Sequence, residues 1–99
     1  MKIVAVTACP TGIAHTYMAA EQLEKTARGL GHQLRVETQG SMGIENELSP
    51  EEIAEAEVAI LAVDIEVEGL ERFDRKKIVR VSVTEAIKNP RGVLAKAGA

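Results

Sequence analysis

The cysteine at position 9 stands in a segment whose residue types suit phosphate chemistry. Residues 9–16 read CPTGIAHT, directly after a short apolar run and directly before a helical pattern. The first amides of a helix have no partner within the helix, so they bind anions readily. The same amides stabilise a thiolate, which is the reactive form of cysteine. The segment therefore favours a cysteine nucleophile beside a bound tetrahedral oxyanion over the alternative, in which Cys9 is only a small buried hydrophobic residue.

The residues that follow Cys9 are candidates for holding that oxyanion. Gly12 allows an amide to turn inward where a side chain would block it, and two threonines in the segment add hydroxyls. Pro10 belongs to the segment but has no N–H to donate. The predicted phosphoryl-binding residues are Pro10, Thr11, Gly12, Ile13, Ala14, His15 and Thr16.

His15 has two interpretations at this stage. It can assist catalysis by donating to the phosphoryl group or by favouring the thiolate, and it can equally bind loop backbone. A metal role is not expected, because His15, His32 and Cys9 lack the spacing of a ligand set. We therefore expect neither a metal nor a cofactor.

The end of the segment separates hydrolysis from transfer. Cysteine phosphatases carry an arginine followed by Ser or Thr at the end of a loop of similar length, whereas this chain has His15 and Thr16 there. Arginine binds a phosphoryl group through two parallel N–H donors. Without that arginine we expect poor hydrolysis, while a phosphocysteine can still form. This pattern favours a phosphoryl carrier.

Strand and helix patterns alternate along the chain, and they must position the cysteine. Strand patterns occupy residues 3–6, 33–38, Val58–Val63 and Ile78–Val81. Helical patterns cover residues 13–30, 50–56 and Val83–Lys88, with the last continuing past Pro90 to Lys96. The first helix has an apolar stripe of Ile13, Tyr17, Ala20, Leu23, Ala27 and Leu30. The alternation predicts a three-layer, doubly wound α/β domain with a four-stranded parallel sheet, order 2-1-3-4, and helices on both faces.

Loops after the other strands supply further candidates, because ligands of doubly wound sheets bind beyond the carboxyl ends of the strands. Gly40, Ser41 and Gly43 follow the second strand, where a structural loop is the favoured interpretation. Asp64 follows the third strand. It would be a general acid in a phosphatase, but a carboxylate repels a bound phosphate, so a loop or cap role is favoured.

Composition sets the protein class. The chain has 99 residues, of which 45% are hydrophobic and 27% charged, and this is typical of one globular domain over residues 1–99. Residues 90–99 are a candidate linker or tail. The net charge of −3 and the scarcity of aromatic residues argue against nucleic-acid binding. A lone cysteine and the absence of an export signal predict a cytoplasmic protein.

Charge is unevenly distributed between two neighbouring stretches. Residues 45–71 contain acidic but no basic side chains, and residues 72–80 are mostly basic. A solvated surface is the favoured interpretation. The alternative is a docking surface in which Arg72, Arg75, Lys76 and Lys77 attract an anionic partner.

The chain resembles the fructose-type enzyme IIB domain of the phosphoenolpyruvate-dependent sugar phosphotransferase system. The segment AVTACPTGIAHTYMAAEQLE is similar to the family's signature around its phosphorylated cysteine. VETQGSMG, LSPEEIAEAEVAILAVDIEV and the pair RF at 72–73 also match, so the resemblance covers residues 2 to about 86.

The resemblance implies a function and its partners. Cys9 would accept a phosphoryl group from a phosphohistidine of the IIA partner and pass it to a sugar, fructose or a related one, carried by the membrane transporter IIC. The domain would then lie in the cytoplasm, peripheral to the inner membrane. Two alternatives stay open: a small cysteine phosphatase or arsenate-reductase-like enzyme, and a regulatory binding module phosphorylated at Cys9.

Overall fold

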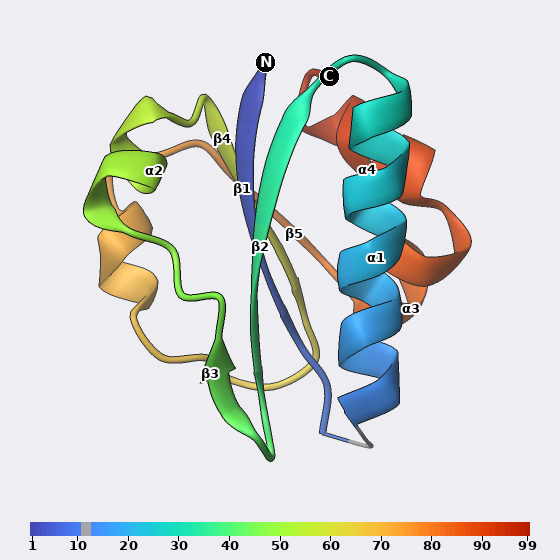
Figure 1. Cartoon of the computed structure of the whole chain (residues 1–99), viewed down its shortest axis with the longest axis vertical. Coiled ribbons are helices and arrows are strands. Elements are labelled where there is room, and N and C mark those ends of the chain that lie inside the picture. The colour runs from blue at the N-terminus through green and yellow to red at the C-terminus, as the bar shows by residue number, and fades with distance from the viewer. Residues whose placement is uncertain (11–12) are drawn as a thin grey trace.

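A mixed sheet lies at the centre of the computed structural model, which describes residues 1–10 and 13–99 (Figure 1). Its strands are β1 (Lys2–Ala8), β2 (Gln33–Gly40), β3 (Gly43–Glu45), β4 (Val58–Val63) and β5 (Ile78–Val81). In the described part of the chain they form one five-stranded sheet in the order β3-β2-β1-β4-β5. Neighbouring strands are parallel except for the β2–β3 pair, which is antiparallel.

The four parallel strands have the predicted order, but the fifth strand corrects the prediction of a purely parallel, four-stranded sheet. Gly43 was expected to belong to a loop and no strand was predicted after it, but residues 43–45 pair back along the edge of β2. Gly43 has a φ of 83°, which favours glycine and reverses the chain tightly enough for Gly40 to face Gly43. A strand of three residues is too short to show an alternating pattern in the sequence.

Helices cover both faces of the sheet, as predicted (Figure 1). One face, called the helical side because it carries the long helix α1 (Ile13–Gly29), also carries α3 (Val83–Lys88) and α4 (Pro90–Lys96). The buried residues of these three helices join one apolar cluster. The opposite side carries α2 (Pro50–Glu55) and the 3₁₀ helix η1 (Leu70–Phe73), whose buried residues join a second cluster. Each cluster includes alternate residues of β1 and β4, so the sheet is buried on both faces.

The buried stripe of α1 differs from the predicted one. Leu23 and Ala27 are buried as expected, but Tyr17 and Leu30 are 42% and 40% exposed. Among residues 14–29 of the helix, those fully or almost fully buried are Thr16, Ala19, Leu23 and Ala27. The contact line with the sheet therefore runs beside Tyr17, whose bulk is accommodated at the surface.

Two short helices replace the single C-terminal helix that the sequence predicted. Asn89 separates α3 from α4 because the residue before a proline is disfavoured in helical geometry. Its side chain accepts a hydrogen bond from the Gly92 amide at 3.2 Å and so caps α4. Val93 and Leu94 are fully buried, so this candidate linker packs into the core of the helical side. Among the described helices, none has the length and hydropathy needed to cross a bilayer.

Candidate active site

Cys9 lies just beyond the carboxyl end of β1, the central strand of the sheet. Its neighbour Ala8 pairs with Val63 of β4, and the Ala8 carbonyl accepts a hydrogen bond from the Asp64 amide at 3.0 Å. On the other side of β1, Thr7 pairs with Thr38 of β2. The cysteine therefore sits where the segments after three parallel strands converge, with only 9% of its surface exposed.

The predicted phosphoryl-binding residues are only partly described. Thr11 and Gly12 lie outside the described residues. Helix α1 begins at Ile13, so its first turn follows the cysteine closely, as the sequence predicted. Within this stretch Pro10, Ala14 and His15 are exposed, whereas Thr16 is only 1% exposed.

Two threonines connect the end of β1 to the first turn of α1. The Thr7 hydroxyl donates to the Thr16 carbonyl at 3.1 Å, and both residues are buried. The Thr16 hydroxyl is itself buried and has no hydrogen-bond partner among residues 1–10 and 13–99. Buried hydroxyls normally have a partner, so this one is chemically suited to bind a ligand oxygen.

Two pockets meet at Cys9. The loop-side pocket, of about 270 Å³, is lined by Gln39, Gly40, Ser41 and Gly43 at the β2–β3 turn and by Ile65, Glu66 and Glu68 after β4. The helix-side pocket, of about 390 Å³, is lined by His15 and Met18 of α1, Asp64, and residues of α3. His15 and the four candidates from the loops after β2 and β4 therefore line pockets that Cys9 also lines. These four are Gly40, Ser41, Gly43 and Asp64.

Asp64 binds the first turn of helix α3. Its Oδ1 accepts a hydrogen bond from the Val83 amide, the first residue of α3, at 3.2 Å. A carboxylate at a helix N-terminus is favoured by the helix dipole. Asp64 therefore adds a hydrogen bond to the first turn of α3, whose N-cap residue is Ser82, and it connects the segment after β4 to α3.

Tyr17 and Glu45 form a contact that the sequence did not reveal. The Tyr17 hydroxyl donates to the Glu45 carboxylate, which joins the start of α1 to β3. This hydrogen bond raises the pKa of Tyr17 above its usual value, because the carboxylate stabilises the protonated phenol. The partners are 28 residues apart, so no local pattern marks the pair.

A buried ion pair between Glu37 and Arg72 is the second feature missed by the sequence analysis. Arg72 Nη1 and Nη2 donate to the two carboxylate oxygens of Glu37 at 2.8 and 3.0 Å. Gln39 Nε2 and the Leu48 amide donate to the same carboxylate at 2.7 and 3.0 Å. Burial of Glu37 tends to raise its pKa, but these hydrogen bonds outweigh it and the pKa is lowered.

Arg72 therefore does not form the docking surface that the sequence offered as an alternative. Its guanidinium turns inward to the fully buried Glu37 and is held over the Phe73 ring at 5.0 Å from the ring centroid. The charge run gave no sign of this, because the partner is 35 residues away. An unpaired buried carboxylate is costly, and the arginine fork supplies two of its hydrogen bonds.

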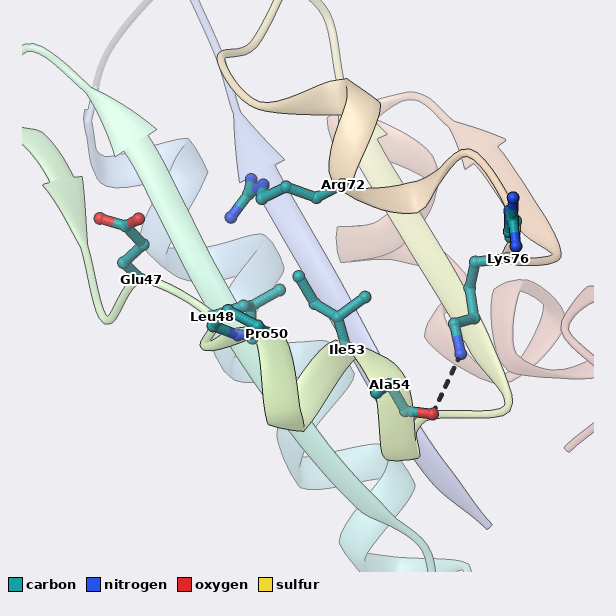
Figure 2. Close-up of a pocket in the computed structure, with 8 residues that line it drawn as sticks. Glu47, Leu48, Pro50, Ile53, Ala54, Arg72 and Lys76 are labelled. Carbon is teal, nitrogen blue, oxygen red and sulfur yellow. Dashed lines mark hydrogen bonds between the residues drawn. The ribbon is translucent and has the colours of Figure 1, made fainter.

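The largest of the described pockets, of about 410 Å³, lies away from Cys9 on the side of α2 and η1. Figure 2 shows Leu48, Pro50 and Ile53 along one side of it and Arg72 reaching in from η1. Lys76 at its edge donates to the carbonyls of Ala54 and Ala56 at 3.4 and 2.6 Å, where it stabilises the end of α2. Of the three cations that line this pocket, Arg72 and Lys76 bind groups of the chain itself, and Arg75 is exposed.

No cluster of three or more His, Cys, Asp or Glu that could hold a metal occurs in the described part of the chain.

Comparison with known proteins identifies the family. The family model of the phosphotransferase system (PTS) "Lactose/Cellobiose specific IIB subunit" matches residues 4–96. The Escherichia coli K12 protein "PTS system fructose-like EIIB component 2" is 53% identical over 95 residues, which are 96% of this chain and 90% of that protein. The Bacillus subtilis "PTS system fructose-specific EIIABC component" is 50% identical over 96 residues, which are 97% of this chain and 15% of that protein.

Solved structures agree with the sequence comparisons. A crystal structure of a domain from the fructose-specific IIABC component of Borrelia burgdorferi superposes with a TM-score of 0.92 at 50% identity. The match covers 96% of this chain and 90% of that one. A domain of fruA from Bacillus subtilis gives a TM-score of 0.89 at 47% identity, over 99% of this chain and 93% of that one. The chain belongs to the IIB family of the sugar phosphotransferase system and is a phosphoryl-transfer component of the fructose type.

Proposed function

We propose that Cys9 is the phosphoryl carrier of this IIB component. It accepts the group from a phosphohistidine of a IIA partner and passes it to a sugar carried by a membrane IIC transporter. The observation that most supports this proposal is the position of Cys9. It follows the central strand, precedes the first turn of α1, and borders both pockets at this end of the sheet.

The first step is a displacement at phosphorus. The Cys9 thiolate attacks in line with the bond between phosphorus and the donor imidazole nitrogen. The S–P bond forms, the P–N bond breaks, and the imidazole leaves with the electron pair of that bond. The phosphoryl oxygens then lie against amides of residues 11–16 and the hydroxyls of Thr11 and Thr16, which stabilise their charge.

The second step moves the group to the sugar. A sugar hydroxyl oxygen attacks phosphorus, the S–P bond breaks, and Cys9 leaves as a thiolate. A thiolate is stable enough to leave without a general acid, especially at a helix N-terminus. The base that removes the hydroxyl proton belongs to the transporter. His15 lines the helix-side pocket with Cys9, and we assign it an assisting role as a donor to the phosphoryl group.

Hydrolysis is the less favoured chemistry for a specific reason. The described residues that line the two pockets at Cys9 include no arginine. A phosphatase uses such an arginine to hold the transferring group in its transition state. The nearby Arg72 is bound to Glu37 and does not border either pocket.

The names of the relatives support the choice of partners. One E. coli K12 relative is a "Fructose-like PTS system EIIBC component", and the B. subtilis relative is an EIIABC component. In those proteins a domain similar to this chain occupies 19% and 15% of a longer sequence. We therefore propose a IIA donor, a IIC transporter that holds the chain at the inner membrane, and fructose or a related sugar as the acceptor.

The test is a reconstituted transfer to sugar. Purified chain is combined with phosphorylated fructose-type IIA and membranes that contain a fructose-type IIC, and formation of fructose phosphate is measured. We expect product with the unaltered chain and none with Cys9→Ser. Equal product with both chains would contradict the proposal, and saturable hydrolysis of an aryl phosphate would favour the phosphatase alternative.

A further inference from the structure

We propose that Gln39 is a positioning residue for phosphoryl transfer, acting through the segment between β4 and η1. Within this segment, residues 64–69, Ile65, Glu66 and Glu68 form one wall of the loop-side pocket at Cys9. Gln39 fixes the wall, and the Glu37–Arg72 ion pair fixes Gln39. The inference rests on the proposed role of Cys9 and adds to it how access to the cysteine is shaped.

The side-chain amide of Gln39 forms the pair of hydrogen bonds with the backbone of this segment that the backbone of a neighbouring strand would form. Its Oε1 accepts a hydrogen bond from the Glu68 amide at 2.8 Å, and its Nε2 donates to the Glu68 carbonyl at 3.0 Å. The residue is 6% exposed, so water does not compete freely for these bonds. Gln39 and Glu68 both border the loop-side pocket together with Cys9.

The Glu37 carboxylate determines which way the Gln39 amide points. Nε2 of Gln39 also donates to Glu37 Oε2 at 2.7 Å. An ionised carboxylate only accepts hydrogen bonds, so the NH₂ group must face it. The oxygen of the amide is thereby directed to the Glu68 N–H. An ionised Glu37 is maintained by Arg72, whose two hydrogen bonds hold its pKa low.

Arg72 binds the same segment directly. Its Nε donates to the Gly69 carbonyl at 2.7 Å, and Nη2 lies 3.3 Å from the Glu68 carbonyl. At the other end of the segment, Asp64 is held by its hydrogen bond to the Val83 amide. The intervening Ile65 and Glu66 are exposed and border the pocket.

The hydrogen bonds of Gln39 and Arg72 thus fix the shape of the surface that the phosphoryl donor approaches. The donor must bring its phosphorus in line with Cys9 Sγ, and a wall displaced by a fraction of an ångström changes that approach. Since Ile65 is 38% exposed beside the pocket, the segment is placed to contact the incoming protein. Loosening the segment should therefore weaken productive docking more than the chemical step.

The experiment compares Gln39→Leu with the unaltered chain and with Arg35→Gln. Leucine resembles glutamine in size but makes no hydrogen bonds. Arg35 lies earlier on β2, and its ion pair with Glu52 is on the surface, away from the pockets at Cys9. The rate at which each chain is phosphorylated is measured as the concentration of phosphorylated fructose-type IIA is varied.

Gln39→Leu is expected to raise the KM for the IIA donor about tenfold and to change kcat less than about threefold, as loss of a pair of buried hydrogen bonds suggests. Arg35→Gln should leave both constants unchanged. In parallel, amide hydrogen exchange at Glu68 should accelerate at least about tenfold in Gln39→Leu, while exchange at Leu61 in β4 stays slow.

Each outcome decides between the alternatives. An unchanged KM in a folded Gln39→Leu chain would overturn the inference. Faster exchange at both Glu68 and Leu61 would show that the substitution destabilises the whole chain. If kcat then falls while KM rises, Gln39 has a purely structural role, and the inference is overturned as well. If the unaltered chain is never phosphorylated by IIA, the proposed function fails and the inference fails with it.

Discussion

The two faces of the sheet are stabilised in different ways. On the helical side, α1, α3 and α4 bury aliphatic and small residues such as Leu23, Val93 and Leu94. On the opposite side, α2 and η1 bury Phe73 and several aliphatic residues, and beside them lies the fully buried carboxylate of Glu37 with its arginine partner.

The two faces therefore have different roles: the helical side supplies packing, and the opposite side positions segments of the chain. An aliphatic interface gains stability from burial of area and tolerates changes of detail. A buried carboxylate is stable only with all its hydrogen-bond donors in place, so it fixes the segments that supply them. Glu37 receives donors from β2, from η1 and from the segment before α2. The side of the sheet that carries α2 and η1 therefore holds the segments beside Cys9 in a more specific position than the helical side does.

Removal of Arg72 should have the largest effect on stability. Arg72→Ala leaves the Glu37 carboxylate buried without its cation, and we expect a loss of about 3–5 kcal/mol in the free energy of unfolding at neutral pH. Urea unfolding followed by circular dichroism measures it. The matched control is Arg75→Ala, an exposed arginine three residues further along the chain, which should change stability by less than about 0.5 kcal/mol. Similar small losses in both variants would show that the ion pair contributes little.

The pH dependence of stability should distinguish the two faces next. The pKa of Glu37 is lowered in the folded state, so the folded chain binds fewer protons than the unfolded chain. Its contribution is fully present above its ordinary pKa of about 4.3 and is lost as pH falls through the lowered value.

Glu37→Gln removes that titration, at a cost of about 1–3 kcal/mol at neutral pH. Unfolding free energies measured between neutral pH and pH 3 should fall less steeply for Glu37→Gln than for the unaltered chain. Leu23→Ala, on the helical side, serves as control and should show the unaltered slope. Identical slopes in all three chains would mean that Glu37 does not respond to acid as its surroundings require.

Helix caps on the two faces should differ by a smaller amount. Ser49 and Glu52 form a reciprocal capping box on α2, with hydrogen bonds of 2.9 and 3.1 Å. Ser82 caps α3 by a hydrogen bond from the Glu85 amide at 3.0 Å. We expect Ser49→Ala to cost about 1–2 kcal/mol and Ser82→Ala about 0.5–1 kcal/mol. Thermal unfolding gives both values, and the reverse order would count against the capping box as the stronger device.

Much of the fold could be predicted because its signals are local. Buried strands such as Val58–Val63 appear as continuous apolar runs, and the Ser49–Pro50 start of α2 is marked by cap chemistry. The short strand β3 and the break at Asn89 were not predicted. A three-residue strand has no periodicity, and the helical propensity of residues 83–96 outweighed the proline in the prediction.

The candidate site could likewise be predicted only where its residues are close together in the sequence. Cys9 and the start of α1 are contiguous in sequence, so the motif could be found without a structure. The contacts of Glu37 with Arg72, of Gln39 with Glu68 and of Tyr17 with Glu45 join residues far apart in the chain. Only the topology of the sheet brings these partners together. The strand pattern of residues 33–38 holds two charged residues, Arg35 and Glu37, and nothing local shows that only Glu37 is buried and needs a partner.

The mass of the intact chain shows directly whether Cys9 carries the phosphoryl group. The chain is incubated with phosphoenolpyruvate, the general phosphotransferase proteins and a fructose-type IIA, beside a Cys9→Ser chain. We predict the mass of one added phosphoryl group on the unaltered chain, located at Cys9 by peptide mapping, and no addition to Cys9→Ser. An unaltered mass in the presence of phosphorylated IIA, or equal addition to both chains, would contradict the account.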